Sequence, residues 1–108
     1  MSTEIQLNEE NCVSLLKRYT DIGYKASKIF SIKDGALLHK YFRVLSKLEE
    51  DKELTPQHIY AVIFKAIEQA NQAGAYDLDS VAVLDRVMTF VRENVLDEPK
   101  ETEKIREI

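Results

Sequence analysis

Apolar residues recur with the 3.6-residue period of an amphipathic helix in four consecutive stretches of this chain. The stretches predict helices over about residues 9–31, 35–50, 56–73 and 79–96. The predicted connections are short, about four or five residues, which favours antiparallel neighbours. We therefore predict an all-α fold, built as a compact four-helix up-down bundle.

The first predicted helix begins after Asn8, whose side chain can cap free amides and whose two following glutamates meet the positive end of the helix dipole. Its apolar face continues beyond Gly23, so we predict one helix over about 9–31, kinked or interrupted at that glycine. The alternative ends the helix at Ile22, with Gly23 as a left-handed cap, and leaves residues 24–33 as a separate short helix or loop.

The second predicted helix follows Asp34 and Gly35, which together are a turn signal. Asp34 can cap this helix, which we predict over about 35–50. An acidic cluster at residues 49–53 lies at the negative end of the helix dipole, where acids are unfavourable. The chain should therefore turn there.

The third predicted helix, over about 56–73, has the clearest start signal. Thr55 can cap its amides, and Pro56 at the first helical position gives up a donor that has no partner in any case. Apolar residues cover about 200° of its circumference, so we expect it to be the most buried helix. Gly74 is the natural left-handed residue after its end.

The fourth predicted helix, over about 79–96, can be capped by Asp77 or by Asp79. After it, residues 97–108 alternate in charge, contain a proline and have only two apolar side chains. We predict that this segment is a flexible charged tail.

The composition is that of one globular domain, which we assign to residues 1–96: the chain has 108 residues, of which 44% are hydrophobic and 31% charged. No apolar run approaches the roughly 20 residues of a membrane span, and no leader of basic and then apolar residues is present. We expect a cytoplasmic protein without a membrane contact. The single cysteine, Cys12, excludes an internal disulfide and a zinc site built on paired cysteines.

Charge is divided unevenly along the chain. Residues 11–47 contain eight bases and two acids, whereas residues 48–108 contain seven bases and fourteen acids. Within the basic part, residues spaced by about one or two turns form a stripe on the second predicted helix, and the preceding helix adds four more bases, Lys17, Arg18, Lys25 and Lys28. The candidate binding surface is Lys33, Lys40, Arg43, Lys47, Lys25 and Lys28. Such a stripe has three interpretations: an ordinary solvated face, a surface for an acidic protein, and a surface for nucleic-acid phosphates.

No residue pattern indicates catalysis, a metal or a cofactor. Cys12 shares a helical face with leucines, which favours a buried, inert thiol. His39 and His58 lie on different predicted helices without metal-ligand spacing, so we expect surface histidines. A calcium loop counted from Asp77 lacks the required glycine and glutamate. We expect that the protein is not an enzyme.

The function that we predict is therefore a small helical protein-interaction module: an adaptor, a regulator or an assembly component. The apolar arcs of the third and fourth helices exceed what one face of a small bundle buries, so we expect a homodimer or another protein as partner. The alternative is a nucleic-acid-binding accessory protein that uses the basic stripe within residues 17–47.

Overall fold

The computed structural model describes residues 7–96, and within them it contains helices and no strand. The helices are α1 (Glu9–Ser27), α2 (Ile32–Leu45), α3 (Pro56–Gln72), α4 (Leu78–Phe90) and the short π-helix η1 (Val91–Val95) that continues α4. This confirms the predicted all-α fold of four main helices. The predicted tail at 97–108 lies outside the described residues.

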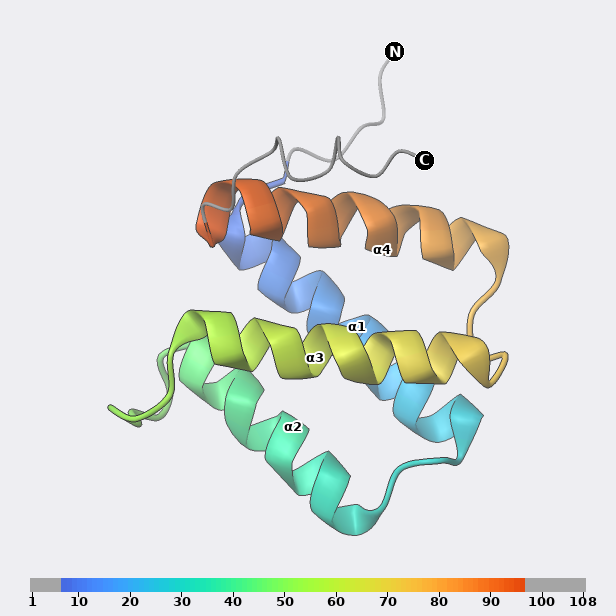
Figure 1. Cartoon of the computed structure of the whole chain (residues 1–108), viewed down its shortest axis with the longest axis horizontal. Helices are drawn as coiled ribbons and strands as arrows, with labels where there is room; N and C mark the ends of the chain where they lie inside the picture. The colour runs from blue at the N-terminus through green and yellow to red at the C-terminus, as the bar shows by residue number, and fades with distance from the viewer. Residues whose placement is uncertain (1–6, 97–108) are drawn as a thin grey trace.

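Consecutive helices run in roughly opposite directions, as an up-down order requires (Figure 1). Helix α1 passes behind α3 in this view, with α4 above this central pair and α2 below it. Helix α1 packs against all three other helices and most extensively against α3.

Three helix starts follow the predicted capping chemistry, in which a side-chain oxygen accepts from an amide three residues later. Asn8 accepts from Asn11 at 2.8 Å, Thr55 from His58 at 3.1 Å and Asp77 from Ser80 at 2.8 Å. The hydrogen bond from the Ser80 backbone is also the main cause of the lowered pKa of Asp77. Gly74, with φ of 86°, is left-handed as predicted.

The prediction for the end of the first helix was wrong. Helix α1 runs through Gly23, which confirms the preferred prediction of one helix across this glycine, but it ends at Ser27 and not at about residue 31 or at Ile22. Lys28, with φ of 59°, is the left-handed cap of α1. Gly23 is buried within the helix, and a Cβ there would meet the Tyr76 hydroxyl. This glycine permits close packing and does not mark a helix end.

The bounds of the second helix also differ from the prediction of 35–50. Ser31, and not Asp34, is its N-cap, and the two residues form a reciprocal capping box. The Asp34 amide donates to Ser31 Oγ at 3.1 Å, and the Ser31 amide donates to Asp34 Oδ2 at 3.0 Å. The helix ends at Leu45, and Lys47 beyond it is left-handed with φ of 63°.

Helix α3 supplies more buried side chains than any other described helix, as its wide apolar arc predicts. The core lies mainly where α1, α3 and α4 meet. Its fully buried side chains are Tyr60, Leu16, Ile59, Ile63, Val87, Val91 and Cys12.

Candidate interaction surface

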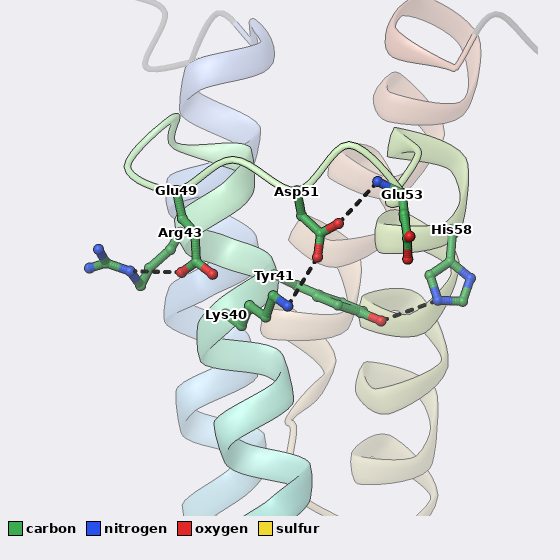
Figure 2. Close-up of polar contacts among 7 residues, drawn as sticks. All are labelled: Lys40, Tyr41, Arg43, Glu49, Asp51, Glu53 and His58. Atoms are coloured by element: carbon green, nitrogen blue, oxygen red, sulfur yellow. Dashed lines mark hydrogen bonds and ion pairs between the residues drawn. The ribbon is translucent and has the colours of Figure 1, made fainter.

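The two central cations of the predicted basic stripe are paired with acids. Figure 2 shows the loop at residues 46–55 folding back over the end of α2, so that Lys40 Nζ lies 3.0 Å from Asp51 Oδ2 and Arg43 Nε lies 3.3 Å from Glu49 Oε1. The hydrogen bond with Asp51 raises the pKa of Lys40, and the same bond lowers the pKa of Asp51. The acidic cluster thus marks a turn, as predicted, and also offsets part of the stripe.

The other four candidate cations are dispersed. Lys25 pairs with Asp21 on its own helix at 3.3 Å. Lys28 lies in the connection after α1, Lys33 in the first turn of α2, and Lys47 beyond the end of α2. The six cations therefore do not form one continuous helical stripe, because only Lys33, Lys40 and Arg43 belong to α2.

A second polar contact joins α2 to the start of α3. The Tyr41 hydroxyl and His58 Nε2 share a hydrogen bond of 3.2 Å, and the two rings meet edge to face at 5.9 Å (Figure 2). His39 and His58 are both exposed, as predicted. Within residues 7–96, no group of three or more His, Cys, Asp or Glu side chains could hold a metal ion.

Sequence reasoning missed a groove of about 770 Å³ between α1 and α2, which we call the α1–α2 groove. Its lining is Ser14, Lys17, Arg18, Thr20, Asp21 and Tyr24 from α1, and Ile32, Gly35, Ala36, Leu38, His39 and Phe42 from α2. Most of the accessible lining is apolar. Helical periodicity identifies the apolar face of each helix but not the separation of two helices, so it did not predict this groove.

Tyr24 forms the end wall of the α1–α2 groove. Its ring stacks on Phe30, with ring centroids 6.2 Å apart and planes 9° apart, and its hydroxyl donates to the Ser31 carbonyl at 3.4 Å. A Cβ at Gly35 would lie 2.8 Å from Tyr24 Cε2. The glycine therefore gives the Tyr24 ring its place against α2.

Two features of the groove are unusual for a closed helix pair. Thr20 lines the groove and is only 8% exposed, yet its Oγ1 has no hydrogen-bond partner in the described part of the chain. Ile32, also in the lining, is 85% exposed. An unpartnered hydroxyl and a large exposed apolar side chain thus share one depression.

No family model, curated protein or solved structure matches this chain. Function must therefore be argued from the site itself. Within the described residues, no helix is both long enough and apolar enough to cross a membrane.

The exposed large apolar side chains do not lie on the helices where the sequence predicted a surplus. The exposed large hydrophobic residues of the described chain are Ile22, Ile29, Ile32, Leu37, Leu48 and Leu78. Only Leu78 belongs to α3 or α4, although we expected a surplus on those two helices. Cys12 is fully buried, as predicted, and burial is the main cause of its raised pKa.

Proposed function

We propose that this chain is a small helical interaction module, an adaptor, regulator or assembly component, that binds a protein partner in the α1–α2 groove. The observation that carries the proposal is Ile32, which is 85% exposed beside the apolar lining of the groove. Apolar side chains gathered in a depression are typical of protein-binding sites, and covering them removes apolar surface from water.

The alternative of nucleic-acid binding has less support. Lys40 and Arg43 are held by Asp51 and Glu49, so neutralising phosphates with them would require breaking two ion pairs. The homodimer that the apolar arcs of the third and fourth helices predicted stays a prediction.

The test compares two substitutions that introduce the same charge at equivalent helix positions in different parts of the surface. Ile32 and Leu78 each occupy the first position of a helix, and they are 85% and 86% exposed. An aspartate there meets the positive end of the helix dipole, so both variants should remain folded. Only Ile32→Asp places a charge in the groove.

We expect a cytoplasmic protein, so immobilised wild type and both variants are exposed to cytosolic extract of the native host. A partner identified by mass spectrometry should be retained by wild type and by Leu78→Asp and lost from Ile32→Asp. Identical retention by all three proteins would contradict the proposal.

A further inference from the structure

We infer that the occupant of the α1–α2 groove is an amphipathic helix of the partner, with acidic residues along the edge of its apolar face. The inference rests on the proposed function and specifies the partner's chemistry. It follows from the backbone of the groove walls, from the size of the groove, and from the charges on its rim.

The walls of the groove determine which backbone conformation the occupant can adopt. Both walls are α-helices, whose backbone donors and acceptors are used internally except at the ends. An extended segment would find no sheet edge to pair with, whereas a helix satisfies its own backbone groups. The lining of α1 extends from Ser14 to Tyr24, which at 1.5 Å per residue is about 15 Å, or about three turns of a bound helix.

The α2 wall allows close approach of such a helix. Ala36 adds little side chain to the lining, and Ile32 stands exposed one turn before it, whereas the space over Gly35 is taken by the Tyr24 ring. A small residue beside a large apolar side chain lets a ridge of a third helix fit between α1 and α2. The apolar face of the occupant should therefore contact Ile32 and Ala36.

The rim determines the charge of the occupant. Lys17 and Arg18 are exposed on the α1 side, and neither is ion-paired within the described residues. The one acid of the lining, Asp21, is already paired with Lys25 at 3.3 Å. His39 adds a polar side chain to the lining on the α2 side. Acidic side chains of the partner would thus complete charge pairs at the rim.

The acidic stretch of the partner should be short. Beyond Ser14 the space between the helices continues as a hollow of about 460 Å³ that is lined by Glu9 and Glu10 as well as by Lys47. Two glutamates there would repel further acids of the partner. The acids of the bound helix should therefore stand opposite Lys17 and Arg18.

The Thr20 hydroxyl is a further feature that the fold alone does not use. A buried hydroxyl without a partner reduces stability, and replacing it with a methyl group of the same shape should relieve that cost. Because Thr20 Oγ1 is covered by the fold, Thr20→Val should raise the melting temperature.

The experiment uses two fluorescent synthetic peptides of about 18 residues that share one Leu/Ala apolar face. One carries glutamates along the edge of that face and the other carries lysines. In about 50 mM salt, fluorescence anisotropy should show at least tenfold tighter binding of the glutamate peptide to the full chain. Its helicity, measured by circular dichroism, should rise on binding, and a central proline should abolish binding.

Charge-reversal variants show whether the rim is responsible. Lys17→Glu with Arg18→Glu should reverse the preference between the two peptides. The matched control is Lys52→Glu with Arg86→Glu, which makes the same change in net charge at exposed positions outside the groove lining. Ile32→Asp should weaken binding of the glutamate peptide, and Leu78→Asp should not.

Several outcomes would overturn the inference. Equal affinity for the two peptides, or a preference unchanged by Lys17→Glu with Arg18→Glu, would remove the charge argument. A single-stranded oligonucleotide that displaces the glutamate peptide from the groove would identify nucleic acid as the occupant. A concentration-dependent dimer that Ile32→Asp dissociates would identify a second copy.

The two proposals fail separately. A host protein lost from Ile32→Asp, together with equal binding of the two peptides, would leave the proposed function standing without an acidic helix. Retention of the same host proteins by Ile32→Asp would remove the proposed function itself.

Discussion

Helix α1 has two sides that differ in how completely they are covered. Toward α3 it is closed: a Cβ added at Gly23 would lie 2.8 Å from Ala70 Cβ, and the Tyr76 hydroxyl donates to the Tyr19 carbonyl at 2.6 Å. Toward α2 it is open along the α1–α2 groove. One helix thus contributes both to the stability of the fold and to a surface available to a partner.

The largest expected effect comes from truncating a side chain on the closed side. Leu16 is fully buried, so Leu16→Ala should lower the free energy of unfolding by about 3 kcal/mol, measured by urea denaturation. The control on the open side is Ile32→Ala, which should change it by less than about 0.5 kcal/mol because Ile32 is 85% exposed. Equal losses from the two variants would mean that the groove is as tightly packed as the core.

An intermediate effect on the free energy of unfolding is expected from two glycines. Gly23 packs on the closed side of α1, and Gly35 packs against Tyr24 on the open side. Alanine improves helix propensity by about 1 kcal/mol at either position. At Gly23, overpacking against Ala70 and the Tyr76 hydroxyl should outweigh this gain and leave a net loss of about 1 kcal/mol.

At Gly35 the added Cβ meets only the ring of Tyr24, a side chain that can move. Gly35→Ala should therefore be neutral or stabilising by up to about 1 kcal/mol, and should weaken peptide binding because the end wall shifts. Urea denaturation and fluorescence anisotropy check the two effects. A larger loss of stability from Gly35→Ala than from Gly23→Ala would contradict the distinction between the sides.

The smallest effect concerns the tyrosine that joins the loop before α4 to α1. Tyr76→Phe removes the hydrogen bond to the Tyr19 carbonyl and should cost about 0.5 kcal/mol at neutral pH. Tyr60→Phe is the comparison, because the Tyr60 hydroxyl is buried without a partner among residues 7–96 and its removal should cost less.

The same tyrosine should make stability depend on alkaline pH. Burial raises the pKa of Tyr76 from 10.0 to about 12, so the fold favours the neutral phenol. The contribution of the neutral Tyr76 phenol to the stability of the fold is complete below pH 10 and is lost as the pH rises toward 12. The melting temperature of Tyr76→Phe should therefore fall less steeply than that of wild type between about pH 9 and 11. Parallel curves would exclude this linkage.

Local chemistry explains which parts of the fold could be predicted. The starts of α1, α3 and α4 depend on Asn8, Thr55 and Asp77, whose side chains bond amides three residues away. The ends of α1 and α2 depend on left-handed Lys28 and Lys47. Lysine carries no signal for that conformation, which the sequence marks only through glycine or asparagine.

The candidate site was less predictable because it depends on how helices meet. Periodicity identified the apolar face of each helix, but the groove arises from the separation of α1 and α2. The candidate cations could be named from the sequence, but the pairing of Lys40 with Asp51 arises only because the loop folds back. Lys17 and Arg18 are basic residues that the sequence shows, but only the packing of α1 beside α2 places them in the groove lining.

The burial of Cys12 provides a native reporter of conformational opening. It is the chain's single thiol and is 0% exposed, so an alkylating reagent can reach its Sγ only when α1 separates from the core. The alkylation rate of the unmodified protein therefore measures how often the core opens, without an engineered label. By the same logic, covalent dimers formed under oxidising conditions would come from opened molecules, because the native state shields the sulfur.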